Sequence, residues 1–343
     1  MQRRYLISSG IAVAVAPSLV VAQAAIDAAR PVRRLDAAAG EPQKLAFGLI
    51  TPRNAEQTLK NWNPFIDRMS KAVGLPIERR TYATQGELVK DFLAGQLELA
   101  WLGNAPALEI VEADAGGVFA AMVVQGKTAY RSLLLVHQDS PVRTLADVIK
   151  QAPQMVFGDG DIKSTSGHIV PKYFAFVKKG VNDPEKIFKE VRRGSHESNQ
   201  LAVARREVDI ATNNTSELDN FRTSKPELAS LLRVVWESPD IPESPMIWRT
   251  SLSPMLKSKI ASFTYNFGAK DDEEKGILWN INKLTAFRRS SNRQLVTIAD
   301  LEMFNARQAI NNNQGLTPEQ KALQTEAVTK RGSKLELMLK RAA

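Results

Sequence analysis

The chain has 343 residues, with 46 lysines and arginines against 37 aspartates and glutamates, which gives a formal net charge of +9 at pH 7. It has no cysteine, and this excludes disulfide bonds, thiolate metal sites, a thiol nucleophile and a lipid-bearing cysteine. Because the basic residues are scattered among acidic ones and form no stripe with interleaved aromatics, the charge predicts no nucleic-acid binding, only a faster encounter with small anions.

The N-terminus has the pattern of a signal peptide. Arg3 and Arg4 precede an apolar run over residues 10–21, which ends in small residues around Ala24. We expect residues 1–24 to be cleaved near Ala24 on export, by either the ordinary secretory (Sec) route or the twin-arginine (Tat) route. The apolar run is short for a membrane span, so a retained anchor is the weaker alternative.

Strands and helices alternate along the next segment. The predicted elements are a strand at residues 44–50, a helix at 55–73, a strand at 77–82, a helix at 85–94 and a strand at 97–101. Gly74 ends the first helix, and Gly103 follows the third strand. The alternation is typical of a mostly parallel sheet in an α/β fold, with helices on its faces.

The same pattern returns further along the chain. Phe47-Gly48 matches Phe157-Gly158 at an offset of 110 residues, and Ala100 matches Ala211 at an offset of 111. The chain is also longer than one ordinary domain. Near-equal offsets of several elements in such a chain predict two similar α/β lobes.

We expect the chain to cross between the lobes twice, near residues 130–135 and near residues 236–248. The resulting segments are a linker at 25–43, the first part of lobe 1 at 44–130, lobe 2 at 131–238, the second part of lobe 1 at 239–315 and a helical tail at 316–343. The tail opens with the capping pattern Thr317-Pro318-Glu319. We expect its helix to break near Gly332 and to pack on the lobe or on a second subunit.

Three hydroxyl residues in a row, Ser164-Thr165-Ser166, lie between the strand that holds Phe157 and a predicted helix at residues 169–178. Free N–H groups at the start of a helix favour anions, and serine and threonine add donors there. Taken alone, such a run is more often a helix cap. Ligands of open parallel sheets lie beyond the carboxyl ends of strands, so the loops at 103–104, 158–166 and 212–216 should face one cleft.

Eight strings in chain order carry a resemblance to a known family. They are Phe47-Gly48, Trp62-Asn63-Pro64-Phe65, Ala100-Trp101-Leu102-Gly103-Asn104, Ser164-Thr165-Ser166-Gly167, Gly194-Ser195-His196-Glu197-Ser198-Asn199, Ala211-Thr212-Asn213-Asn214-Thr215, Ile247-Trp248-Arg249 and Phe287-Arg288-Arg289-Ser290-Ser291. Over residues 44–310 the chain resembles the periplasmic phosphonate-binding proteins of ABC transporters, the phosphate/phosphite/phosphonate-binding (PhnD) family. The resemblance implies a type II-like periplasmic binding protein of two hinged α/β lobes, a small phosphorus oxyanion as ligand, an ABC permease in the inner membrane as partner, no cofactor and no catalysis.

The resemblance also implies roles for single residues. Ser164, Thr165 and Ser166 stand where family members donate hydrogen bonds to the oxyanion. His196 and Tyr130 match further oxygen-binding positions. Without the family, His196 has the position of a surface residue at a helix start, and Tyr130 that of an aromatic packed at the hinge.

One part of the family's pocket differs in this chain. Where aminoalkylphosphonate binders of the family place two carboxylates around the ammonium group, this chain has Ser216 and Ser244, and Gln85 replaces a tyrosine. An unpaired buried ammonium is costly, so these changes argue against 2-aminoethylphosphonate and for a neutral substituent or a simpler oxyanion such as phosphite or phosphate. Glu217 and Glu243, one residue away, supply the carboxylates if the loops shift.

Two other functions are open to the same residues. A hydrolase needs a nucleophile, a base and an orienting acid, for which Ser166, His196 and Asp209 are the candidates, but the Gly-x-Ser-x-Gly string is missing. A binding protein for another anion, such as sulfonate or nitrate, needs only the hydroxyl run. His137, His168 and His196 show no ligand spacing with acids, which predicts no metal site.

Overall fold

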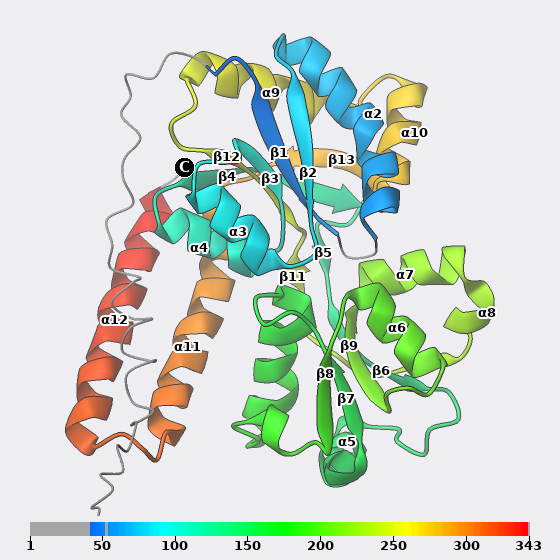
Figure 1. Ribbon diagram of the computed structural model, residues 1–343, viewed down its shortest axis with the longest axis vertical. Coiled ribbons are helices and arrows are strands. Elements are labelled where there is room, and N and C mark those ends of the chain that lie inside the picture. Colours follow the sequence, from blue (N-terminus) through cyan, green and yellow to red (C-terminus); the bar gives the residue numbers. More distant parts are fainter. Residues whose placement is uncertain (1–41, 52–53, 342–343) are drawn as a thin grey trace, which may run out of the picture. The chain divides into compact units, whose positions relative to one another are not determined.

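The computed structural model describes residues 42–51 and 54–341. The predicted signal peptide, its cleavage site and nearly all of the predicted linker therefore lie outside the described residues. Among the described residues, none of the helices combines the length and the apolar character needed to cross a membrane. The chain folds around two main sheets, each accompanied by helices (Figure 1).

The larger sheet has six strands in the order β13-β4-β12-β3-β1-β2, and we call this part lobe 1. Its strands are β1 (Leu45–Ile50), β2 (Ile77–Tyr82), β3 (Leu99–Trp101), β4 (Gly116–Val124), β12 (Pro245–Arg249) and β13 (Leu284–Arg289). Its helices are α2 (Ala55–Val73), α3 (Gln85–Leu93), α4 (Asn104–Glu112), α9 (Pro254–Asn266) and α10 (Asp272–Asn280). Phe65 of α2 packs against the rings of Phe263, Phe267 and Phe287 in its core.

The smaller sheet has five strands in the order β10-β6-β9-β7-β8, and we call this part lobe 2. Its strands are β6 (Ser132–His137), β7 (Val156–Asp159), β8 (Glu190–Arg193), β9 (Ile210–Asn214) and β10 (Leu232–Glu237). Its helices are α5 (Leu145–Gln151), α6 (His196–Ala204), α7 (Thr215–Ser224), α8 (Pro226–Ala229) and the short turns η2 (Thr165–Ile169), η3 (Lys172–Phe176) and η4 (Val177–Lys179).

The repeat that the sequence predicts is confirmed in the strand register. In each lobe the first strand of the repeat pairs in parallel with the later one, and the paired residues are Phe47 with Leu99, Gly48 with Ala100, Phe157 with Ile210 and Gly158 with Ala211. A Cβ atom on Gly48 would lie 2.6 Å from the Leu97 side chain, and one on Gly158 would lie 2.9 Å from that of Ala211. Both glycines therefore permit close packing that no larger residue allows.

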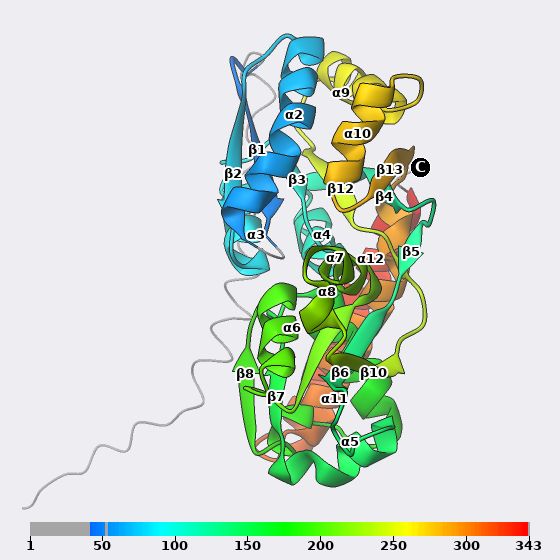
Figure 2. The same ribbon diagram turned by 90° about the vertical axis from the view of Figure 1, so that its right-hand side faces the viewer.

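The two crossings between the lobes lie side by side. β5 (Ala129–Tyr130) pairs antiparallel with β11 (Ile241–Pro242). In both views of the ribbon, the six-stranded sheet lies above this crossing and the five-stranded sheet below it (Figures 1 and 2). The first crossing ends earlier than predicted, because the chain from Ser132 onward already belongs to β6.

The structure also corrects two further expectations about regular elements. The sheets are mixed, not mostly parallel, because the returning strands β12 and β13 in lobe 1, and β6 and β10 in lobe 2, pair antiparallel. The helix expected from residue 169 begins four residues earlier, at Thr165. There the Ile169 amide donates to the Ser164 carbonyl, which is the wide turn of a π-helix, a form frequent at functional sites.

The C-terminal part forms two adjacent helices, α11 (Val296–Asn312) and α12 (Pro318–Arg341) (Figure 1). The predicted break near Gly332 is wrong, because α12 continues through it. Leu335 and Leu339 beyond the glycine are buried, and Arg331 makes a bidentate ion pair with Glu112 of α4. These contacts hold the last turns on lobe 1 and outweigh the low helix propensity of one glycine.

Candidate binding site

The loops at the carboxyl ends of β7 and β9 line a cavity of about 750 Å³. Lobe 1 contributes to the same cavity through residues of β3 and β4 and the start of α3. The structure brings together all of the candidate residues on its wall, namely Gln85, Tyr130, Ser164, Thr165, Ser166, His196, Ser216, Glu217, Glu243 and Ser244. The segments expected to face one cleft therefore do so, as the topology of parallel strands requires.

The three hydroxyl residues have different surroundings. The Ser164 hydroxyl is the helix cap and accepts a hydrogen bond from the Gly167 amide at 3.0 Å. The Thr165 hydroxyl is buried and accepts from the Ala105 amide of α4 at 2.9 Å. Both hydroxyls use an oxygen lone pair in these bonds, so their hydrogens remain available for an oxyanion.

Ser166 is the centre of a second cluster of donors. Its Oγ lies 3.3 Å from Nε2 of His196, and the Asn214 side-chain amide donates to it at 3.3 Å. The Tyr130 hydroxyl group lines the same cavity. Asn214 was missed as a site residue from sequence, although it falls within the loop expected to face the cleft. Hydroxyl, imidazole, phenol and amide groups thus converge on one wall.

The electrostatics keep His196 and Tyr130 uncharged near neutral pH. Burial lowers the pKa of His196 to about 4, so its imidazole is neutral. Burial, together with the nearby Glu243 carboxylate, raises the pKa of Tyr130 above its ordinary value. Both groups are therefore neutral hydrogen-bond donors, which hold an anion without a formal positive charge.

One part of the cavity, which we call the side pocket, is lined by Gln85, Ser216, Glu217, Glu243 and Ser244 and so holds two carboxyl groups. Glu217 and Glu243 are both buried, and Ser216 donates to Glu243 at 3.4 Å. Burial raises the pKa of Glu243 to about 7, and the charge of Glu217 adds to the rise. Gln85 accepts a long bond of 3.4 Å from the Gly103 amide. The two acids adjacent in sequence to the serines therefore reach the cavity after all.

An ion-pair network that the sequence did not predict reaches the cavity through Arg193. Nδ1 of the buried His168 lies 2.7 Å from Asp159, and Arg193 lies 2.9 Å from Glu185 and 3.7 Å from Asp159. Asp159, His168 and Glu185 are the residue types that bind metals, and their ligand atoms lie within 4.8 Å of one another. The guanidinium of Arg193 already serves both acids, so a metal ion would compete with it.

The geometry does not assemble the hydrolase triad. Ser166 and His196 are in contact, but the Asp209 carboxylate accepts from the Val156 amide at 2.7 Å, at the start of β7. β7 ends at the cavity, so its start lies at the other end of the strand. An imidazole with a pKa of about 4 is also a weak general base at neutral pH.

Comparison with known proteins identifies the family. The family model described as "ABC transporter, phosphonate, periplasmic substrate-binding protein" matches residues 47–295. The chain belongs to this family. The phosphonates-binding periplasmic protein of Escherichia coli strain K12 is 37% identical over 289 residues, which cover 84% of each chain.

Solved structures of similar proteins agree with the fold. The crystal structure of a binding protein component of an ABC phosphonate transporter from Pseudomonas aeruginosa has a TM-score of 0.79 and 35% identity, and covers 86% of this chain and 97% of its own. PhnD1 from Prochlorococcus marinus, solved with methylphosphonate, has a TM-score of 0.67 at 20% identity, and the match covers 76% of this chain and 97% of that one. The two-lobed α/β fold of periplasmic binding proteins is thus confirmed.

Membership of this family sets the class of function. The protein is a periplasmic phosphonate-binding component of an ABC transporter, and its membrane partner is a permease. Its relatives are substrate-binding proteins and not enzymes. The sequence-based prediction of a non-catalytic binding protein is therefore confirmed.

Proposed function

We propose that the phosphonate group of the ligand binds to Ser164, Thr165, Ser166, His196 and Tyr130, while its substituent lies beside Glu243 and Glu217. The observation that carries this proposal is the convergence of neutral donors in one cavity with two buried acids. Charge-assisted hydrogen bonds contribute about 1.5–3 kcal/mol each, and 1 μM affinity corresponds to about 8 kcal/mol. Several such bonds are enough for tight capture.

Binding is coupled to closure of the lobes in this proposal. The anion first meets the hydroxyl run on lobe 2, and lobe 1 then closes over it and excludes water. Because the same contacts favour the closed form, the ligand shifts the population toward the form that the permease in the inner membrane receives. Residues 1–24 serve as the export signal, cleaved near Ala24 through the Sec or Tat route.

The substituent is best matched by an ammonium group, as in 2-aminoethylphosphonate. From sequence, the serines at positions 216 and 244 argued against such a ligand. In the structure Glu217 and Glu243 line the cavity, and a buried carboxylate gains most from a cationic partner. The short alkyl chain would contact apolar side chains of the same cavity, namely Trp101, Met122 and Val124.

Isothermal titration calorimetry with a panel of ligands tests the proposal. We expect the wild-type protein to bind 2-aminoethylphosphonate and methylphosphonate more tightly than phosphate, phosphite or an alkylsulfonate. Tighter binding of phosphate, phosphite or sulfonate would instead favour the alternative of a binding protein for that oxyanion.

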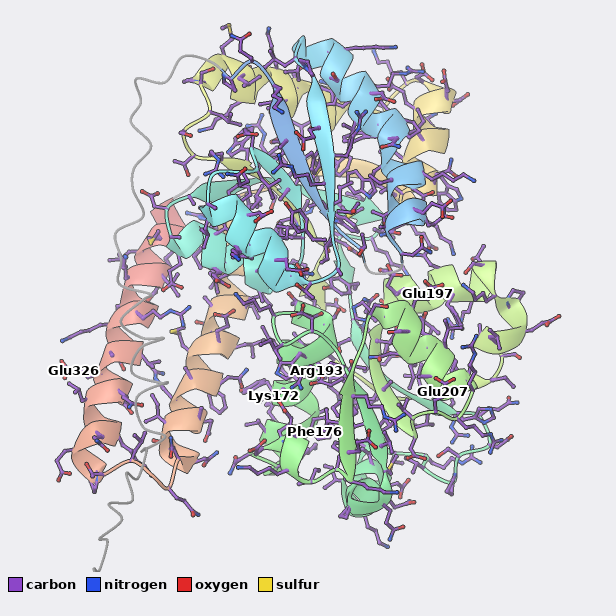
Figure 3. All side chains as sticks on the ribbon, viewed as in Figure 1. Lys172, Phe176, Arg193, Glu197, Glu207 and Glu326 are labelled. Carbon is purple, nitrogen blue, oxygen red and sulfur yellow. The ribbon has the colours of Figure 1, made fainter. Side chains whose placement is uncertain are left out.

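The substitution Glu243→Gln tests the contact to the substituent separately from the contacts to the phosphonate group. We expect it to weaken binding of 2-aminoethylphosphonate about tenfold, because the buried ammonium loses its ionised partner. Methylphosphonate, which has no ammonium, should bind within about twofold of wild type. Glu207→Gln is the matched control, because Glu207 is exposed beside β9 and outside the cavity (Figure 3). Equal losses for both ligands with Glu243→Gln would refute this placement of the substituent.

The preference for 2-aminoethylphosphonate over methylphosphonate should depend on pH in a definite direction. Glu243 of the free protein has a pKa of about 7, so below that pH it must lose a proton before it can pair with an ammonium. Affinity for 2-aminoethylphosphonate relative to methylphosphonate should therefore fall as the pH is lowered from about 8 to about 6. The same ratio measured with Glu243→Gln, which lacks the titrating carboxyl group, corrects for the different titrations of the two phosphonates, and the fall should be absent in this variant.

We further propose a homodimer through the tail. Leu323 and Leu337 of α12 are 69% and 58% exposed, although Leu335 and Leu339 of the same helix are buried on lobe 1. Light scattering on the mature protein is expected to give twice the chain mass, and Leu323→Lys with Leu337→Lys to give the monomer mass. A wild-type monomer at the same concentration would contradict the proposal.

A further inference from the structure

The loop that carries the hydroxyl run also reaches across to lobe 1. Three residues of this loop contact helices of lobe 1 through a hydrogen bond or an ion pair. They are Asp161, Lys163 and Thr165. Ser164 and Ser166 are assigned to the ligand, and Thr165 is assigned to both the ligand and lobe 1. Side chains that hold the ligand are therefore adjacent in this loop to side chains that contact the other lobe.

The first of these contacts uses a helix start. One oxygen of the Asp161 carboxylate accepts from the Gln85 amide, the first residue of α3, at 3.1 Å. The other oxygen accepts from the Lys163 amide at 2.7 Å and so fixes the loop itself. A carboxylate at a helix N-terminus is stabilised by the helix dipole.

The second contact is an ion pair between the lobes. Nζ of Lys163 lies 2.7 Å and 3.0 Å from the two oxygens of Glu109, one turn into α4. Its stem passes Gly86 of α3, where an added Cβ would lie 3.9 Å from the lysine carbons. The side chains of Lys163 and Glu109 are 36% and 42% exposed, so the pair is accessible but spans the two lobes.

We propose that Glu109, which does not line the cavity, is a positioning residue for phosphonate binding: through Lys163 it holds the anion-binding loop against lobe 1 in the closed form. This inference rests on the proposed function of the loop. Since ligand affinity includes the free energy of closure, a contact made only between closed lobes contributes to affinity without touching the ligand. Release of the ligand requires the pair to break.

The direction in which Glu109→Gln changes phosphonate affinity distinguishes a positioning role from simple charge repulsion. Glu109→Gln removes a negative charge close to an anion site, and by Coulomb's law alone it should tighten phosphonate binding. If Glu109 holds the two lobes together, loss of its ion pair with Lys163 should weaken methylphosphonate binding about three- to fivefold, the range of a partly exposed ion pair. The change should appear as a faster dissociation rate, with the association rate unchanged.

A double-mutant cycle completes the test, with surface plasmon resonance on the mature protein and methylphosphonate. Lys163→Met should also weaken binding, and the double variant should be no weaker than Lys163→Met alone. Glu326→Gln is the control, because Glu326 forms an equivalent pair with Lys330 within α12, away from the cavity (Figure 3). It should leave the dissociation constant unchanged.

Each outcome has a distinct meaning. Equal or tighter binding by Glu109→Gln, or additive losses in the double variant, would overturn the positioning role and leave the proposed ligand site standing. Failure of the wild-type protein to bind methylphosphonate would instead remove the proposed function itself. Thermal unfolding of the ligand-free variants checks that they are folded, which we expect because both side chains are partly exposed.

Discussion

Thr165→Val is expected to weaken phosphonate binding at least about a hundredfold. The substitution keeps the shape of the side chain but removes the hydroxyl, so the oxyanion loses a charge-assisted hydrogen bond of about 1.5–3 kcal/mol. The Ala105 amide of α4, which donates to this hydroxyl at 2.9 Å, is also left unsatisfied in the closed form, at a cost of about 1–3 kcal/mol. Together these losses of binding free energy exceed the contribution of a typical surface contact.

Calorimetry with methylphosphonate measures this loss directly. Thr264→Val is the matched control, because the Thr264 hydroxyl is also buried but bonds to the Ile260 carbonyl within α9 of lobe 1. It should lower the free energy of unfolding by about 1 kcal/mol and leave the affinity unchanged. An affinity for Thr165→Val within threefold of wild type would show that the hydroxyl holds neither the ligand nor the other lobe.

Gly160→Ala is the second substitution with a large expected effect. Gly160 donates to the Gly167 carbonyl, and a Cβ atom at position 160 would lie 2.7 Å from that oxygen and 2.8 Å from the adjoining backbone carbons. Backbone cannot give way as the end of a side chain can, so the loop must open. We expect binding to weaken at least about thirtyfold, the equivalent of about 2 kcal/mol of strain.

The control for this variant is Gly276→Ala in α10, where an added Cβ meets no atom within 4 Å. It should bind methylphosphonate normally and gain up to about 1 kcal/mol in helix stability. If Gly160→Ala bound with wild-type affinity, the geometry of the hydroxyl run would not matter for the ligand.

Much of the fold follows from local sequence. Helix α2 has the predicted ends, because Asn54 caps its start and Gly74 adopts a left-handed conformation at its end. The parallel strands around Gly48 and Gly158 were found from their repeat, since both need glycine for the same close approach. The capping residues lie next to the helix ends that they specify, and the repeat is carried by two short strings that can be matched without knowing the fold.

Other features depend on contacts between distant segments. The continuation of α12 through Gly332 depends on burial of Leu335 and on the Arg331 pair with Glu112, which no local pattern contains. The same holds for the early, wide helix turn at Thr165, because its hydroxyl bonds to α4 in the other lobe. Local propensity gives way where tertiary contacts are strong.

The candidate site also combines features that are visible in local sequence with features that depend on contacts between distant segments. The hydroxyl run was visible in the sequence because its chemistry is contiguous. Lys163 and Glu109 are separated by 54 positions, and Glu243 lies far from Ser216 in sequence, so their meeting is a consequence of the lobes coming together. Sequence alone named the two serines and the neighbouring Glu217 and Glu243 as candidates for the substituent, but only the folded chain brings all four to the cavity wall.

A crystal structure of the mature protein with methylphosphonate tests the central claim most directly. We expect the phosphonate oxygens to lie within about 2.5–3.2 Å of the hydroxyls of Ser164, Thr165 and Ser166, with the methyl group directed toward Glu243. A phosphonate bound elsewhere, with these three hydroxyls facing only solvent, would contradict it.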